Sequence, residues 1–173
     1  MAIFMTDQSF KRWYDYDTIL SKMVGSLETM TNDSRRLFGY MICCFSKTLI
    51  LSQTRTEFLF SLNLSKVKGL FKSQAKRRWY DQDPVLHKAF NLLYSLDDEN
   101  RQIVTEKLFA PASVVREYEL ACKEEKLKPD PIIVHQIIET CFLQNAEQAR
   151  EFFRSWLNHK KTMRGGFYLD SSM

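Results

Sequence analysis

Apolar residues along this chain recur at intervals of three and four positions, the spacing of amphipathic helices, and no stretch of useful length alternates as a strand would. One such run follows Asp17 and another follows Asp83. Because aspartate is a preferred N-cap residue, each run predicts a helix that begins directly after it. Pro84 suits this interpretation, since proline is favoured at the first helical position. The first run contains Leu20, Met23, Val24, Leu27 and Met30, and the second contains Leu86, Ala89, Phe90, Leu93 and Leu96.

Each predicted helix ends at a short polar stretch, residues 31–34 in one case and 97–100 in the other, which is typical of a turn. A second helical run follows each turn. Its apolar members are Leu37, Met41, Cys44 and Phe45 in the first half of the chain, and Ile103, Val104 and Leu108 in the second. Each half therefore predicts two antiparallel helices joined by a short connection.

The two halves also share sequence. Residues 12–17 read RWYDYD and residues 78–83 read RWYDQD, an offset of 66 residues. Four further pairs at this offset are identical, namely Leu20 with Leu86, Lys22 with Lys88, Leu27 with Leu93, and Arg35 with Arg101. We interpret this pattern as an internal duplication that gives two pseudo-symmetric helical-hairpin repeats, at about 10–75 and about 76–143.

The rest of the chain predicts further helices. One apolar run at helical spacing covers 60–71, Pro111 predicts a break within the second repeat, and a closing helix is expected at about 146–160. The segment 162–173 has no period and contains adjacent glycines, so we expect a mobile tail. The prediction is an all-α fold, in which residues 1–161 form a single compact helical bundle of six to eight helices.

Composition changes this picture little. The chain has 173 residues, of which 45% are hydrophobic and 27% charged, as is ordinary for one globular domain. Its 25 basic and 21 acidic residues give a net charge of +4, which permits binding to a polyanion without arguing for it.

The most apolar stretch, 37–51, is shorter than the roughly 20 residues of a membrane-spanning helix. The first ten residues do not resemble a signal peptide. We therefore expect a cytoplasmic protein without a membrane partner.

The two RWYD segments are the first candidates for chemistry. One interpretation is that their aspartates converge to bind a metal ion or a basic partner, since carboxylates suit hard cations. The favoured interpretation is structural: one aspartate in each copy caps a helix, and the aromatic residues hold the incoming chain against it. The residues of this structural motif are Trp13, Tyr14, Asp15, Asp17, Trp79, Tyr80, Asp81 and Asp83.

Nothing in the sequence indicates an enzyme or a cofactor. His87, His135 and His159 are far apart, and there is no phosphate-binding glycine loop and no nucleophile with a recognisable partner. His135 and Glu139 stand four residues apart, which more often gives a surface hydrogen bond than an acid–base pair. The four cysteines form no CxxC pair and are interpreted as ordinary thiols. No catalytic, metal-binding or cofactor-binding residue is therefore assigned.

A basic stretch supports a nucleic-acid alternative. From residue 58 to residue 80 there is no acidic residue, and three of the lysines repeat every four positions along one predicted helical face. Phosphate binding needs such a patch, although the favoured interpretation is a solvated helix surface balanced by acidic residues elsewhere. The candidate residues are Lys68, Lys72, Lys76, Arg77 and Arg78.

The segment 78–84, which reads RWYDQDP, resembles a WYDxDP-type opening found in small bacterial helical-bundle proteins. The first copy departs from that pattern because Thr18 stands where the second copy has Pro84. The resemblance covers one turn and one helix in each copy. It implies a bacterial origin and an all-helical fold, and it implies no activity and no site residues.

The function that these features favour is a non-enzymatic, cytoplasmic protein-interaction module, whose partner is another protein or a second copy of the chain. Paired helical hairpins present surfaces at a fixed spacing, and helix-in-groove docking is a common use of such surfaces. The alternatives are nucleic-acid binding through the basic stretch and the binding of a metal or metabolite. The closing helix offers a possible partner face, although large apolar side chains are more often part of a core. That candidate face consists of Phe152, Phe153, Trp156 and Leu157.

Overall fold

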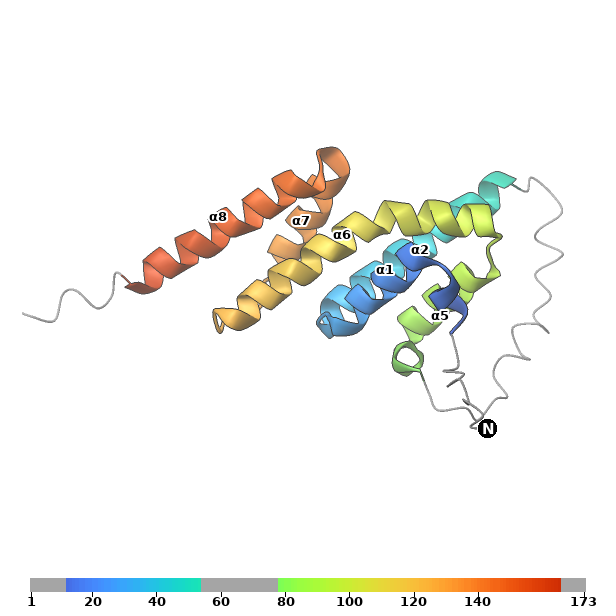
Figure 1. Cartoon of the computed structure of the whole chain (residues 1–173), viewed down its shortest axis with the longest axis horizontal. Coiled ribbons are helices and arrows are strands. Elements are labelled where there is room, and N and C mark those ends of the chain that lie inside the picture. The colour runs from blue at the N-terminus through green and yellow to red at the C-terminus, as the bar shows by residue number, and fades with distance from the viewer. Residues whose placement is uncertain (1–11, 54–77, 166–173) are drawn as a thin grey trace, which may run out of the picture.

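The computed structural model describes residues 12–53 and 78–165, and within these two ranges the chain is helical and has no β-strand. The predicted all-α fold class is confirmed. In the described ranges, six α-helices and two short 3-10 helices (η) follow one another (Figure 1). Their bounds are η1 Trp13–Tyr16, α1 Thr18–Thr29, α2 Asn32–Gln53, η3 Trp79–Gln82, α5 Pro84–Ser95, α6 Asp98–Glu124, α7 Pro131–Leu143 and α8 Ala146–Gly165. The helix predicted over 60–71 lies outside the described residues.

Helices α1 and α5 begin where the sequence predicts. The carboxylate of Asp17 accepts hydrogen bonds from the amides of Ile19 and Leu20, both at 2.9 Å. Asp83 likewise accepts bonds from the second and third residues of α5, at 2.8 and 3.3 Å. These bonds satisfy amides that have no partner within the first turn of a helix. The prediction that Asp17 and Asp83 are N-caps is confirmed.

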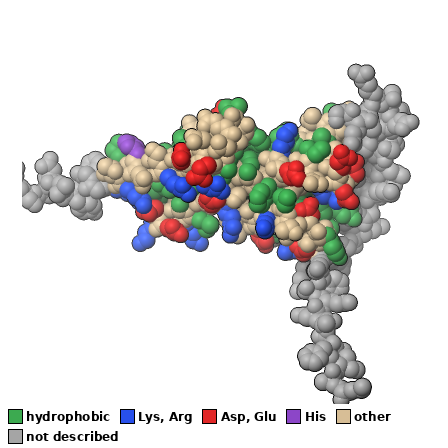
Figure 2. Space-filling view, turned by 45° about the horizontal axis from the view of Figure 1, so that its top comes forward, with side chains coloured by type: hydrophobic (Ala, Val, Ile, Leu, Met, Phe, Trp, Pro, Cys, Tyr) green, Lys and Arg blue, Asp and Glu red, His purple; other side chains and the backbone are tan. Residues whose placement is uncertain are grey.

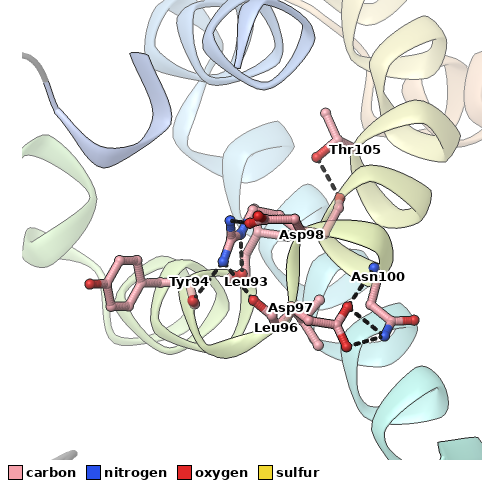
Figure 3. A network of polar contacts seen from close by, with 8 residues as sticks. Leu93, Tyr94, Leu96, Asp97, Asp98, Asn100 and Thr105 are labelled. Carbon is pink, nitrogen blue, oxygen red and sulfur yellow. Dashed lines mark hydrogen bonds and ion pairs between the residues drawn. The ribbon is translucent and has the colours of Figure 1, made fainter. Parts of the chain in front are cut away.

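An arginine closes the corner between the two helices of each half. Arg35 on α2 donates from Nε to the carbonyl of Leu27 on α1 at 3.0 Å, and it also reaches the carbonyl of Glu28. Arg101 on α6 donates in the same way to the carbonyls of Leu93 and Tyr94 on α5, at 3.1 and 3.0 Å. Figure 3 shows the carbonyl groups of Leu93 and Tyr94 in this second network. Each arginine therefore satisfies carbonyls at a helix end that have no partner within the helix.

The two halves interlock. α2 packs mainly along α5, and α1 packs mainly along α6, whereas the two helices within each hairpin contact each other less. At Gly39 on α2, an added Cβ would lie 3.1 Å from Cγ1 of Val85 on α5. This distance is tighter than most real Cβ contacts, so a small residue at position 39 allows α2 and α5 to approach closely. The main interfaces of the bundle are thus formed between the halves.

One apolar cluster fills the centre of the bundle. Its most completely buried large side chains include Tyr14 and Tyr80 from the two 3-10 turns and Phe38 and Phe90 from α2 and α5. The rings of Tyr80 and Phe90 stack with their centres 4.3 Å apart. The cluster continues through α6 into α7 and α8, so one core joins all described helices.

The C-terminal part corrects two sequence-based expectations. Pro111 does not break the chain: it is buried inside α6, which runs from Asp98 to Glu124. Proline removes one backbone hydrogen bond, and the packing of a long helix against several neighbours can compensate for that loss. The predicted start of the tail, at residue 162, is too early, because α8 continues to Gly165. α8 lies at the far end of the molecule from α5 (Figure 1).

None of the helices within the described ranges is long and apolar enough to cross a membrane.

Candidate functional site

The two RWYD segments have the same local structure. In η1, the amide of Arg12 donates to Oδ2 of Asp15 at 2.8 Å, and in η3 the amide of Arg78 donates to Oδ2 of Asp81 at 3.1 Å. Both turns also bury their tyrosine in the core. A hydrogen bond and a buried ring therefore hold each turn in place. The bond from the amide of Arg12 is the main reason that the pKa of Asp15 lies below its ordinary value.

The tryptophans beside these tyrosines also match. Trp13 meets Tyr14 edge-on, with ring centres 5.5 Å apart and planes at 82°, and Trp79 meets Tyr80 at 5.6 Å and 84°. Both tryptophans are partly buried against the core. They therefore pack beside the helix caps, as the structural interpretation of the motif expects.

The ring of each tryptophan also contacts the guanidinium group of an arginine from the other half of the chain. The guanidinium of Arg35 lies 5.3 Å from the centre of the Trp79 ring, and that of Arg101 lies 5.7 Å from Trp13. These are the arginines that close the two hairpin corners. The RWYD segments thus connect the two halves of the bundle, in addition to starting α1 and α5.

The four aspartates of the motif are occupied by protein groups. Asp17 caps α1, Asp83 caps α5 and pairs with Arg36 on α2, and Asp81 contacts Nδ1 of His87 at 2.8 Å. Burial acts to raise the pKa of Asp83, but the bonds from Arg36 and from the first-turn amides outweigh it, so the pKa lies below its ordinary value. Within residues 12–53 and 78–165, no three His, Cys, Asp or Glu side chains are grouped to hold a metal ion. The geometry gives the metal interpretation no support.

A hollow of about 440 Å³ lies between the start of α2 and η3, and its lining is mostly polar. Its size would suit a small molecule. Its two arginines are nevertheless engaged: Arg36 pairs with Asp83, while Arg35 lies over Trp79 and donates to carbonyls of α1. We therefore do not assign a ligand to this hollow.

Burial disfavours the reactive form of three of the cysteines, and the acid–base candidates His135 and Glu139 are both exposed on α7. All four thiols are free, and burial raises the pKa of Cys43, Cys122 and Cys141, which disfavours their reactive thiolates. His87 lies between the Asp81 carboxylate and the amide group of Asn91, with Nε2 2.9 Å from Nδ2 of Asn91.

The sequence did not reveal the role of Glu119, a buried carboxylate on α6. It accepts hydrogen bonds from the amide and the hydroxyl of Thr31, both at 2.7 Å, and from the hydroxyl of Ser34 at 2.6 Å. Thr31 and Ser34 lie at the start of α2. Glu119 therefore binds the beginning of a helix that is more than 80 residues away in sequence, and no local pattern could have indicated this contact.

Most of the basic stretch lies outside the described residues, including Lys68, Lys72, Lys76 and Arg77. Arg78 is described, and its guanidinium donates to the hydroxyl of Tyr80 at 2.6 Å. On the face shown in Figure 2, basic and acidic side chains are interspersed and do not form one basic field. This part of the surface gives the nucleic-acid alternative no specific support.

Two of the four residues in the candidate partner face on α8 belong to the core. Phe153 and Leu157 are buried, and Phe152 and Trp156 are partly buried against the core. The rings of Phe153 and Trp156 lie 5.9 and 5.7 Å from the ring of Tyr118 on α6. These four side chains close the core between α6, α7 and α8, because a helix at the end of a bundle needs a wide apolar face to be held there.

The structure instead reveals an apolar surface where α2 and α7 meet. Phe45 on α2 and Phe142 on α7 have ring centres 6.1 Å apart. About two turns nearer the start of both helices, Leu37 and Val134 line a pocket of about 200 Å³. We call this junction the α2–α7 face. Its row on α2 is half-buried and consists of Leu37, Met41 and Phe45, and in its row on α7 Val134 and Ile138 are buried while Phe142 is exposed.

Exposed apolar side chains also occur on the two helices that form the α2–α7 face. On α2 these are Tyr40 and Leu51, which are 58% and 66% exposed. On α7, Phe142 is 42% exposed and the adjacent Leu143 is 76% exposed. The sequence contained a sign of this surface, since the stretch 37–51 is more apolar than a helix with one buried side requires. A group of exposed apolar residues is typical of an interaction site.

We compared the chain with protein-family models, with curated proteins and with solved structures, and none of the three comparisons gave a match.

Proposed function

We propose that this protein is a non-enzymatic, cytoplasmic interaction module, and that the α2–α7 face is where it binds another protein. The observation that carries the proposal is the contact of the half-buried Phe45 with Phe142, which is 42% exposed and is followed by Leu143, 76% exposed. Exposed apolar side chains cost free energy unless another surface covers them, and Phe142 and Leu143 are adjacent exposed apolar residues at the end of α7.

The construction of the bundle supports this role. α2 is fixed along one side by α5 and is held at its start by Glu119, while α7 is packed against both α6 and α8. Both rows of the α2–α7 face therefore stand on well-packed helices. A rigid surface loses little conformational entropy on binding, and this favours affinity.

The test compares two substitutions of exposed aromatic residues. Phe142→Glu places a charge in the α2–α7 face, whereas Tyr16→Glu makes a similar change at a residue that is 79% exposed in η1. Tagged wild-type protein and both variants would be used for affinity capture from the native cell, followed by mass spectrometry. We expect a protein that is recovered with the wild type and with Tyr16→Glu, and lost with Phe142→Glu.

Circular dichroism and thermal melting would show that both variants remain folded. Recovery of the same proteins with all three forms would contradict the assignment of the α2–α7 face. Failure to recover any protein, together with a melting temperature raised by a metabolite, would contradict the interaction module itself.

A further inference from the structure

We propose that two copies of this chain can exchange halves, so that residues 12–53 of each copy pack against residues 78–165 of the other. The exchanged bundles would have the same contacts as the bundle of a single chain. This inference goes beyond the proposed function, because it makes a second copy of the chain a partner and does not use the α2–α7 face. The packing between the halves, the polar contacts across them and the length of chain that joins them carry it.

Each half obtains most of its packing from the other half. α2 packs mainly along α5 and α1 mainly along α6, whereas the two helices of each hairpin contact each other less. Phe38 on α2 and Phe90 on α5 are both buried, and they belong to different halves. A hairpin without a complement would expose such side chains, at a cost in free energy that any complementary half can remove. The complement does not need to belong to the same chain.

Polar contacts between the halves fix how they are aligned. Arg36 on α2 pairs with Asp83 at the start of α5. Nε of Arg116 on α6 donates to the hydroxyl of Thr29 on α1 at 3.0 Å, and the carboxylate of Glu119 binds the start of α2. A half from a second copy has the same groups at the same positions, so these contacts would align it in the same way.

The chain that joins the halves is long enough for either arrangement. The 24 residues at 54–77 can span at most about 80 Å. The longest of the described helices, α6, has 27 residues and is therefore about 40 Å long. Because the closed and exchanged forms contain the same contacts, they differ mainly in how the halves are tethered. Exchange should therefore become appreciable as the protein concentration approaches the effective concentration of tethered halves, in the millimolar range.

The experiment uses two full-length variants that fit each other only when their halves are exchanged. A Cβ added at Gly39 on α2 would lie 3.1 Å from Cγ1 of Val85 on α5. Gly39→Val should therefore clash within its own chain, whereas Val85→Ala should leave a gap. Exchange between the two variants places the enlarged side chain opposite the reduced one, and the second bundle keeps the wild-type pair.

Equal amounts of the two variants would be unfolded in urea, refolded together and examined by size-exclusion chromatography with light scattering. We expect a heterodimer at a concentration about tenfold or more lower than the wild type needs to form a dimer. Wild-type protein refolded at about 1 mM should also contain a dimer, and this second measurement does not depend on the folding of any variant.

Controls separate exchange from other association. A chain that carries both Gly39→Val and Val85→Ala should stay monomeric at the concentration where the mixture dimerises, because its closed form already fits. A mixture and a 1 mM wild-type sample that both contain only monomers would overturn the exchange. A dimer formed equally by each variant alone would also overturn it, since such a dimer would not depend on how the halves match. Adding Phe142→Glu to both chains should leave the heterodimer intact, and its loss would assign the association to the α2–α7 face instead.

Discussion

The guanidinium of Arg35 lies over the ring of Trp79, with 5.3 Å between Cζ and the ring centre. Arg35 belongs to the first half of the chain and Trp79 to the second. In the corresponding contact, Arg101 of the second half lies over Trp13 of the first half. Both arginines also donate to the carbonyls that end the preceding helix. One side chain in each half therefore closes its own hairpin and holds the RWYD segment of the other half.

Replacing either arginine should destabilise the bundle. For Arg101→Ala we expect a loss of about 2–3 kcal/mol in the free energy of unfolding, because several hydrogen bonds from a charged donor are removed. Arg101→Lys should recover only part of this loss, since lysine keeps the charge but lacks the planar guanidinium. Urea denaturation would measure both changes. Arg154→Ala, at a residue 58% exposed on α8, is the control and should change stability by less than about 0.5 kcal/mol.

The buried carboxylate of Glu119 should stabilise the fold by accepting hydrogen bonds. Glu119→Gln keeps the shape but weakens three bonds from Thr31 and Ser34, so we expect a loss of about 1–3 kcal/mol. Glu124→Gln, at an exposed position near the end of the same helix, should have little effect. Equal urea midpoints for the two variants would show that the start of α2 does not depend on Glu119.

Two phenylalanines in the C-terminal part should respond differently to truncation. Phe153 is 4% exposed and packs against Tyr118, so Phe153→Ala should cost about 3–5 kcal/mol by leaving a cavity. Phe142 is 42% exposed, and Phe142→Ala should cost less than about 1 kcal/mol. Chemical denaturation would distinguish a core residue from a residue of the α2–α7 face. Similar losses for the two variants would contradict the burial that separates them.

Acid should destabilise the protein. The pKa values of Asp15, Asp83 and Glu117 are all lowered in the folded chain: the amide of Arg12 acts on Asp15, the bonds from Arg36 and the α5 amides outweigh burial at Asp83, and Arg150 acts on Glu117. A carboxyl group with a lowered pKa contributes stability that is complete above its unfolded pKa, near pH 4, and is lost as the pH falls through the folded pKa. The free energy of unfolding, measured by urea denaturation between pH 6 and pH 2, should fall as the pH is lowered.

Asp83→Asn provides the internal comparison for this pH dependence. The variant should be less stable than the wild type at pH 6, and the difference should shrink at pH 2, where Asp83 itself becomes protonated. A difference that stays constant over this range would show that the charge of Asp83 does not contribute.

The two halves should remain together after the chain is cut between residues 65 and 66. The interfaces between α1 and α6 and between α2 and α5 are larger than the contacts within either hairpin, so each half supplies most of the other's packing surface. We expect coexpressed fragments 1–65 and 66–173 to copurify and to show the helical circular dichroism spectrum of the intact chain. Two fragments that fold separately and do not associate would contradict this account of the bundle.

The sequence by itself determined the class of fold and several local features. Helical spacing of apolar residues specified the helices, and Asp17 and Asp83 specified where α1 and α5 begin, because both signals depend on neighbours only a few residues away. The match between the RWYD segments indicated that they share a local structure, and η1 and η3 do so. The duplication itself stays an inference from the sequence.

Only the tertiary structure decided how these elements meet. It showed that Arg35 and Arg101 cross to the opposite tryptophans, that Glu119 binds the start of α2, and that Pro111 lies within a continuous helix. It also showed that Phe153 and Leu157 on α8 belong to the core, while Phe142 on α7 stays 42% exposed beside the half-buried Phe45. An apolar pattern shows which side of a helix avoids water, but contacts between residues far apart in the chain decide whether another helix covers that side.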